Sequence, residues 1–183
     1  MIFAIRNFSK IKIIPTYNIE NDVLKRISVE LNKMFSLPVV IAEPMEIPQE
    51  SYNKIREQYN STVVLRHLKS LIEPNTATLI ITDVDLFADG LNFVFGEANI
   101  LDSVCIISTC RLWFTMSGSK VYYDFFILRI IKEAVHELGH LMGLGHCRNN
   151  KCVMYFSNSI LDTDRKGKDF CNNCKRRLGL DNS

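Results

Sequence analysis

The sequence lacks a strong excess of charge of either sign, a long uninterrupted apolar run and any recognisable export signal. Its formal net charge is only +2 over 183 residues, too little to indicate an acidic partner across the whole surface. Arg6, Lys10 and Lys12 interrupt the apolar N-terminal stretch where a signal peptide needs a continuous apolar core. The other apolar stretches are far shorter than the roughly 20 residues of a membrane-spanning helix. These absences predict a cytoplasmic protein that does not bind membranes.

Internal repeats and low-complexity linkers are absent as well, so nothing divides the chain. Apolar residues make up 47% and charged residues 23% of the sequence, which is the balance of a globular protein with a buried core. We therefore expect a single domain over residues 1–183, with a monomer as the default state. Within it, residues 1–143 form an N-terminal subdomain, and residues 144–183, which have little aliphatic material, form a C-terminal subdomain.

Hydrophobic periodicity predicts a layered fold. Strand-like runs occupy residues 10–15, 38–42, 78–83, 93–97 and 104–109. Helical spacing indicates helices from a cap at Asn21 or Asp22 to about Phe35, from a cap at Ser61 to before Pro74, and from Ser119 to Gly143. The alternation of strands and helices predicts an α/β (α+β) fold with a mixed, mainly parallel twisted sheet, helices packed on it and an antiparallel edge.

Two groups of residues, the C-terminal basic residues and two isolated cysteines, are predicted to have no functional role. The basic residues near the C-terminus are interrupted by aspartates, so we interpret them as a solvated face; they are Arg165, Lys166, Lys168, Lys175, Arg176 and Arg177. Cys105 and Cys110 stand alone in apolar sequence and are interpreted as buried thiols.

The strongest motif in the chain is HExxHxxGxxH, which spans residues 136–146. Four helical residues make about 400° of rotation and about 6 Å of rise, so His136 and His140 share one face of the helix. Both imidazoles can then bind one ion, while Glu137 lies beside that ion and can hold a water molecule. The pattern predicts a catalytic zinc site.

A helix cannot supply the third ligand from the same side, and Gly143 solves this problem. Without a Cβ, glycine can adopt a left-handed conformation that ends the helix and turns the chain back. His146 can then complete a three-histidine site whose fourth position remains open to water, as in catalytic zinc sites. Such an ion activates water and polarises a carbonyl, and Glu137 would accept the proton as general base. The sequence therefore predicts zinc-dependent hydrolysis.

The remaining four cysteines form two close pairs, Cys147-x4-Cys152 and Cys171-x2-Cys174. In a chain without an export signal, this grouping favours a metal site over disulfides. Four thiolates leave no position for water, so we expect a structural zinc that ties the polar C-terminal segment together. The chain would then carry two zinc ions, one catalytic and one structural.

The combined motif HExxHxxGxxHCxxxxCxM, followed by CxxC, resembles the archaemetzincins, a branch of the metzincin zinc metallopeptidases. The resemblance extends to residues 48–61 and 81–98 and so covers most of the domain. It implies a metzincin-like mixed sheet with helices above it, including a long active-site helix, a small zinc-stapled C-terminal subdomain and a cleft between them. It also implies the same two zinc sites, Glu137 as proton acceptor, Met154 as a turn methionine beneath the histidines, and peptides or small proteins as substrates.

Two alternatives remain open at this point. The first is a zinc-stabilised module that binds peptides without cleaving them. The second is a nucleic-acid-binding zinc ribbon, suggested by the cysteines and the basic run at residues 175–177. The ribbon would leave the histidine motif unexplained and lacks interleaved aromatic and basic residues, so we expect no nucleic-acid partner. Met154 and Tyr155 can equally be packing residues, although Tyr155 is also a candidate to stabilise an oxyanion.

Overall fold

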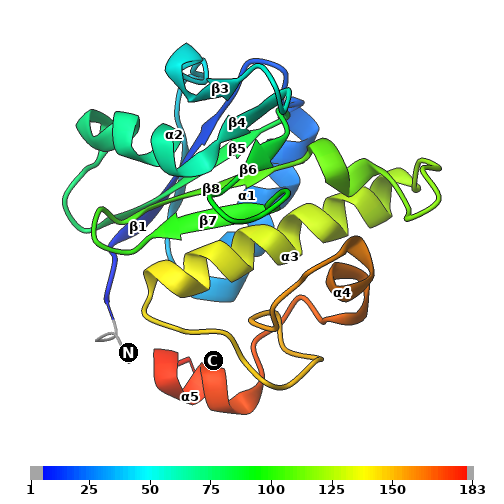
Figure 1. Ribbon diagram of the computed structural model, residues 1–183. Coiled ribbons are helices and arrows are strands. Elements are labelled where there is room, and N and C mark those ends of the chain that lie inside the picture. The colour runs from blue at the N-terminus through cyan, green and yellow to red at the C-terminus, as the bar shows by residue number, and fades with distance from the viewer. Residues whose placement is uncertain (1–5, 181–183) are drawn as a thin grey trace.

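The computed structural model describes residues 6–180 and shows a mixed five-stranded sheet with helices on both faces (Figure 1). The strand order is β2-β1-β5-β8-β7, in which only β7 is antiparallel to its neighbour. The strands are β1 (Lys10–Pro15), β2 (Val39–Ile41), β5 (Thr76–Thr82), β7 (Gly96–Asn99) and β8 (Val104–Ser108). A mainly parallel sheet with an antiparallel edge is confirmed.

Five α-helices and a second small sheet complete the described chain, together with short 3-10 helices at Gln49–Ser51, Leu68–Leu71 and Cys110–Trp113. The helices are α1 (Asn21–Phe35), α2 (Ser61–His67), α3 (Tyr123–Leu141), α4 (Ile160–Arg165) and α5 (Asn172–Leu178). The small sheet comprises β3 (Tyr52–Asn53), β4 (Gln58–Asn60) and β6 (Leu86–Phe87).

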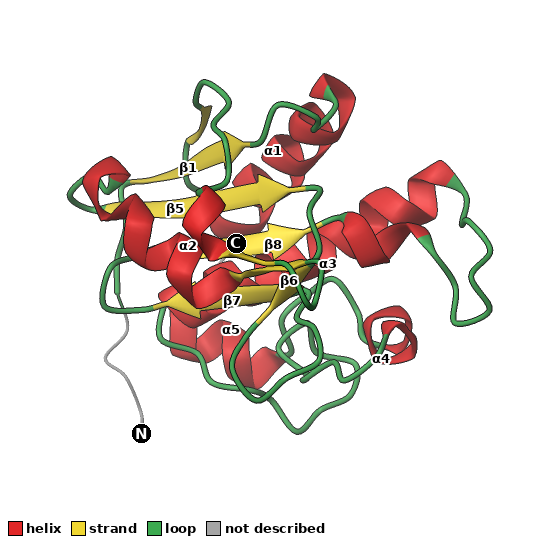
Figure 2. Ribbon diagram, turned by 45° about the horizontal axis from the view of Figure 1, so that its top comes forward, coloured by secondary structure: helices red, strands yellow, loops and turns green. Residues whose placement is uncertain are grey.

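Alternating side chains of the central strands supply two separate cores. Ile13 of β1 and Leu79 of β5 point into the larger core, which they share with α1 and α3. Ile14 and Ile80, one residue later in each strand, point into the smaller core with α2. The period of two along a strand produces this division. Helix α3 thereby lies between the sheet and the C-terminal segment, as Figure 1 shows. Figure 2 shows α2 on the other face of the sheet.

Two predicted helix caps are wrong by one or two residues. Helix α1 begins at Asn21, but its N-cap is Glu20. Helix α2 begins at Ser61, but its N-cap is Asn60, whose side chain accepts a hydrogen bond from the Val63 amide. The Ser61 hydroxyl instead donates to the carbonyl oxygen of Phe87, because tertiary contacts decide between neighbouring polar residues.

The predicted edge strand and the predicted C-terminal region also need correction. The strand expected at residues 93–97 is found at Gly96–Asn99, since Phe93 to Phe95 form part of a loop with an isolated bridge at Val94. The C-terminal segment contains the short helices α4 and α5, which the sequence pattern did not predict. Both are too short to show an apolar period.

A buried polar network joins the middle of α3 to α4. The guanidinium of Arg129 makes two hydrogen bonds to the carboxylate of Asp164, at 2.7 and 2.8 Å. The ammonium of Lys132 donates to the carbonyl oxygens of Thr163 and Asp164. Lys166 is fully buried, with its Nζ 3.1 Å from a carboxylate oxygen of Glu133. The interpretation of Lys166 as part of a solvated face is therefore wrong, since the ion pair holds it inside.

Among the described residues, no helix has the length and apolar character required to cross a membrane. Residues 1–5 of the apolar N-terminal stretch, where a signal peptide would lie, are outside the described residues. Of the two lone cysteines, Cys105 is buried as predicted, whereas Cys110 is only half-buried.

Candidate zinc-binding and catalytic site

The three histidines of the motif lie together at the C-terminal end of α3. His136 and His140 are one turn apart on the helix, and their ring centroids are 4.6 Å from each other. The ring of His146 lies 4.9 Å from that of His140 and 5.4 Å from that of His136. One nitrogen from each ring falls within 4.8 Å of the other two, so the three can share one ion.

Gly143 ends the helix and turns the chain, as predicted. Its φ is +98°, in the left-handed region that glycine adopts without steric cost. The amide of Gly143 donates to the carbonyl oxygen of His140 at 3.0 Å, and the amide of Leu144 donates to that of Gly139 at 3.0 Å. These bonds fold the following loop back so that His146 faces the helix.

Hydrogen bonds fix the protonation of two rings. The Nδ1 atoms of His136 and His140 each lie 2.8 Å from a backbone carbonyl oxygen, of Val153 and Leu144 respectively. A carbonyl oxygen can only accept, so each Nδ1 carries the proton and each neutral ring has its lone pair on Nε2. The two Nε2 atoms lie 3.1 Å apart. Two lone pairs at that distance repel unless a cation lies between them, so the donor set fits a metal ion.

Burial keeps these rings neutral in the absence of an ion. It lowers the pKa of His140 to about 4 and the pKa of His136 well below its ordinary value. Neutral imidazole is the form that binds metals, so the site is suited to an ion at neutral pH. His146 lies in the exit loop and is exposed, but burial of part of its ring also lowers its pKa.

Glu137 lies beside the histidines, and its carboxylate accepts no hydrogen bond from the part of the chain that the structure describes. Burial, followed by the charge of Glu133, raises the pKa of Glu137 well above its ordinary value. Its position depends on Gly96 in β7, where an added Cβ would lie 2.7 Å from the Glu137 Cγ. The edge strand therefore lies directly against the acidic side chain.

A cleft of about 580 Å³ opens in front of these residues. One wall comes from the loop before β7 and from β7 itself, and the opposite wall comes from the segment that follows the cysteine loop, with α3 between them. Its lining residues are Ala88, Leu91, Asn92, Phe93, Val94, Phe95, Gly96, Glu97, Ala98, Ile100, Glu133, His136, Glu137, His140, His146, Phe156, Ser157 and Asn158.

Met154 is fully buried beneath the site, and its carbonyl oxygen accepts a hydrogen bond from the Cys147 amide at 2.8 Å. Its position follows the pattern that the resemblance implied. Tyr155 is half-buried and does not line the cleft, whereas Phe156 and Ser157 do. The candidate role of Tyr155 at an oxyanion has no support from this placement.

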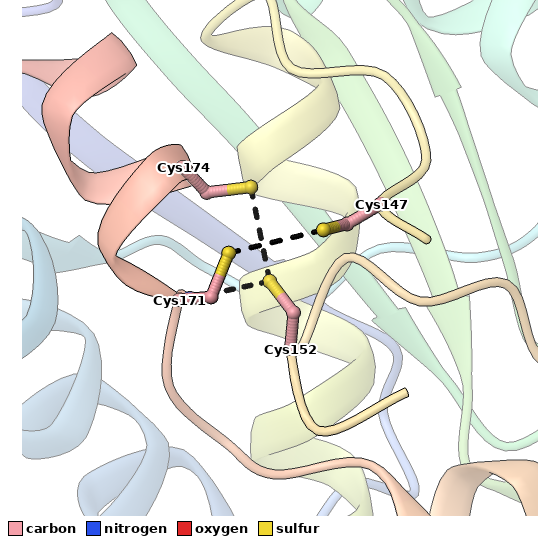
Figure 3. Close-up of side chains that lie close together, drawn as sticks. All are labelled: Cys147, Cys152, Cys171 and Cys174. Atoms are coloured by element: carbon pink, nitrogen blue, oxygen red, sulfur yellow. Dashed lines mark hydrogen bonds between the residues drawn. The ribbon is translucent and has the colours of Figure 1, made fainter. Parts of the chain in front are cut away.

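The four paired cysteines converge on one point, as Figure 3 shows. The Sγ atoms of Cys147 and Cys171 are 3.8 Å apart, as are those of Cys152 and Cys174. Four sulfurs at about 2.3 Å from a tetrahedral zinc ion would be about 3.8 Å from one another. All six cysteines are free of disulfides. The arrangement fits a four-thiolate zinc site, and Cys147 directly follows His146.

Sequence reasoning missed Glu133, Glu97 and the wall at Phe156 and Ser157. Glu133 could have been found, because it precedes Glu137 by one helical turn on the same face of the helix. The wall residues carry no local signal, since only the folding of the cysteine loop brings them to the cleft.

Comparison with known proteins agrees with this architecture. The sequence model of peptidase family M54 matches residues 11–179. The chain is 39% identical to an archaemetzincin of Methanocaldococcus jannaschii, with 92% of each chain covered, and 40% identical to one of Archaeoglobus fulgidus, with 90% of this chain and 96% of the relative covered.

Solved structures show the same fold. A zinc-dependent peptidase of Methanocorpusculum labreanum superposes with a TM-score of 0.85 at 30% identity, covering 92% of this chain and 99% of the other. The archaemetzincin of A. fulgidus in complex with malonate superposes with a TM-score of 0.79 at 39% identity, with the same coverage. This chain belongs to peptidase family M54, the archaemetzincins, and is a zinc metallopeptidase.

Proposed function

We propose that His136, His140 and His146 hold the zinc ion of this peptidase and that Glu137 is its general base. The observation that carries the proposal is the buried Glu137 carboxylate, which faces the cleft beside three convergent imidazoles and has no hydrogen-bond donor from the described chain. A carboxylate held in this way can accept a proton from water within the cleft.

The residues divide the work of hydrolysis. A zinc ion held by His136, His140 and His146 would supply a Lewis acid that lowers the pKa of water towards roughly 7 and polarises a carbonyl. Glu137 takes the proton of the attacking water on its carboxylate and then delivers it to the leaving amine. The carbonyl oxygens of Val153 and Leu144 keep the imidazoles oriented through their Nδ1 protons. Gly96 leaves room for the Glu137 side chain.

We also propose a second, structural zinc ion on Cys147, Cys152, Cys171 and Cys174. Support comes from the sulfur separations of 3.8 Å and from the burial of Cys152 and Cys174. A closed shell of four thiolates offers no place for water, so this ion would stabilise the C-terminal segment and take no part in hydrolysis. The proposed count is two zinc ions per chain.

The open cleft favours a peptide or an unfolded protein segment as the substrate. A monomer and a cytoplasmic location remain predictions of the sequence.

The decisive experiment compares wild type with Glu137→Ala and Glu137→Gln on a peptide library, with cleavage read by mass spectrometry. Wild type is expected to cleave, and both variants are expected to lose activity by at least about 100-fold while zinc content stays the same. Undiminished cleavage by the variants would remove Glu137 as general base. Binding of peptides without cleavage by wild type would favour the non-catalytic module.

A further inference from the structure

The charged side chains that line the cleft are all acidic. They are the carboxylates of Glu97, Glu133 and Glu137, and the lining contains no lysine or arginine among the described residues. The zinc ion proposed above would add positive charge to the same cleft, so a cationic ligand group would depend on direct contact with one of these carboxylates. One of the three, Glu137, is assigned to catalysis above, and the other two differ in the partners of their oxygens.

Both carboxylate oxygens of Glu97 are already engaged. The Ser61 hydroxyl, which also contacts the Phe87 carbonyl oxygen, is in contact with the Glu97 Oε2, and the Thr62 hydroxyl lies 2.8 Å from the Oε1 and 3.0 Å from the Oε2, so its one proton is shared between them. These contacts fix Glu97 against the start of α2. Glu97 therefore has little capacity left for a ligand.

One carboxylate oxygen of Glu133 contacts other side chains, and the other oxygen has no hydrogen-bond partner among the described residues. Its Oε1 accepts a hydrogen bond from the Thr163 hydroxyl at 2.9 Å and lies 3.1 Å from the Lys166 ammonium. Its Oε2 receives no hydrogen bond from the residues that the structure describes. The side chain is only 3% exposed, and yet it lines the cleft. The free oxygen is thus a fixed, largely desolvated acceptor on the cleft wall.

Ser157 supplies a second unsatisfied polar atom on the same cleft. Its Oγ is buried and has no hydrogen-bond partner in the described chain. Buried polar atoms are nearly always paired, so an orphaned hydroxyl at a ligand cleft indicates a group that arrives with the ligand. Lys166 Nζ, also without a hydrogen bond, serves the neighbouring Glu133 through its charge.

Apolar side chains form another part of the cleft lining. Phe93, Phe95 and Phe156 line the cleft together with Val94 and Ile100. Such walls suit the aliphatic stem of a long side chain whose polar end reaches the acidic wall. Among the natural side chains, only lysine and arginine combine a long apolar stem with a cationic, hydrogen-bond-donating end.

We propose that Glu133 and Ser157 form a specificity subsite that binds a lysine or arginine side chain of the substrate next to the scissile bond, and that Lys166 and Thr163 position Glu133 for this task. The proposal rests on the peptidase function proposed above. The Glu133 Oε2 accepts from the cationic end of the substrate, and the Ser157 hydroxyl accepts a second donor from it.

The test uses peptide pairs that are identical except for arginine or methionine at each position flanking the cleavage site. For wild type, kcat/KM is expected to favour arginine by at least about 10-fold at one position, because charge-assisted hydrogen bonds in a desolvated site discriminate strongly. Glu133→Gln is expected to reduce this preference by about 10-fold or more. The ratio of two peptides cleaved by the same sample does not depend on the fraction of folded enzyme.

Two further variants control for an unpaired buried charge and for the removal of any carboxylate from the cleft. Glu133→Gln leaves Lys166 buried without its partner, so the double variant E133Q/K166M removes both charges and should show the same loss of preference. Glu97→Gln is the matched control: it removes a carboxylate from the same cleft, but one whose oxygens are engaged, and the arginine preference should persist. Equal loss in the Glu97 variant would overturn the assignment to Glu133.

A binding measurement tests the basic-side-chain subsite independently of hydrolysis. In the Glu137→Ala background, fluorescence anisotropy with the zinc-loaded protein should show tighter binding of the labelled arginine peptide than of the methionine peptide, and Glu133→Gln should remove the difference. If wild type fails to cleave but the preference for binding the arginine peptide is found, the subsite is supported and the hydrolytic mechanism is wrong. If wild type cleaves both peptides equally well at every position, the subsite falls alone.

Discussion

Gly139 and Met154 are in direct contact beneath the three histidines: a Cβ built on Gly139 would lie 2.5 Å from the Met154 Sδ. The glycine is the fourth residue of the HExxH motif, at one of the two positions that the motif leaves unspecified. Its lack of a side chain lets the turn that carries Met154 lie flat against α3. The helix and the cysteine loop are thereby fixed relative to each other at the point where their histidines meet.

We expect Gly139→Ala to destabilise the protein by about 1–3 kcal/mol, because the added methyl group overpacks a buried contact with a side chain and with Phe170. Thermal unfolding checks the prediction. Gly145→Ala is the matched control, since a Cβ there would meet nothing within 4 Å. Similar melting temperatures for the two variants would show that the side chains around Gly139 can move to accommodate the added methyl group without loss of stability.

Gly96→Ala should reduce peptidase activity without loss of zinc. The new Cβ would lie 2.7 Å from the Cγ and 2.8 Å from the Oε1 of Glu137, and also 2.8 Å from the carbonyl oxygen of Ile106, so the carboxylate and the local pairing of β7 with β8 must both shift. We expect kcat to fall by about 10- to 100-fold, since small misplacements of a reacting group have effects of this size. In the Glu137→Ala background the same change should have no further effect on residual activity. A large additional loss there would mean that Gly96 acts through another group.

The pair between Arg129 and Asp164 should contribute strongly to stability. Arg129 is 1% exposed, and Asp164→Ala would leave its guanidinium buried without a counterion. We expect a loss of about 3 kcal/mol in urea unfolding, as for other broken buried pairs. Asp124→Ala removes an exposed partner of Arg26 and should change stability very little, because solvent screens exposed ion pairs. Equal losses in the two variants would show that the buried pair contributes no more to the free energy of unfolding than the exposed pair.

The metal-free protein should lose stability as the pH falls from about 6.5 to about 4. Burial lowers the pKa of folded His140 to about 4 from an ordinary value of 6.5, so the unfolded chain takes up the proton first and acid favours unfolding. The loss begins near the unfolded pKa and is complete below the folded one. His140→Asn cannot titrate, and its melting temperature should fall less over this range. Identical curves for the two proteins would contradict the prediction.

Cys171→Ser should lower the zinc content by one ion per chain and reduce the melting temperature. Replacing one thiolate opens the proposed four-sulfur shell, whose ion links the start of α5 to the loop after α3. Cys110→Ser, at a half-buried thiol outside this group, should leave the zinc content unchanged. A stable Cys171 variant that keeps both ions would exclude a structural role for the site.

Local patterns were sufficient to predict the sheet and the histidine cluster. The strands that carry Ile13, Leu79 and Ile106 were predicted because they are short apolar runs bounded by turn residues. The convergence of His136, His140 and His146 follows from one helical turn and one glycine, all within eleven residues. Such features depend on neighbours along the chain, and a sequence displays them directly.

Features that depend on distant contacts could not be predicted. Lys166 belongs to a basic stretch that resembles a solvated surface, and only its approach to Glu133 across 33 residues makes it a buried residue. Ser61 and Asn60 are both good caps, and the nearby Phe87 carbonyl decides between them. Ser157 and Phe156 reach the cleft only because the cysteine loop folds back. Tertiary structure assigns these roles after the local patterns are satisfied.

His146 and Cys147 are consecutive residues that belong to different donor groups. With two ions bound as proposed, a single peptide bond would connect the thiolate shell to the imidazole shell. An oxidant that attacked the sulfurs would therefore release the loop that carries the third histidine, and hydrolysis would stop without any chemical change to α3. The peptidase would thus be inactivated by oxidative stress through a site that takes no part in its reaction.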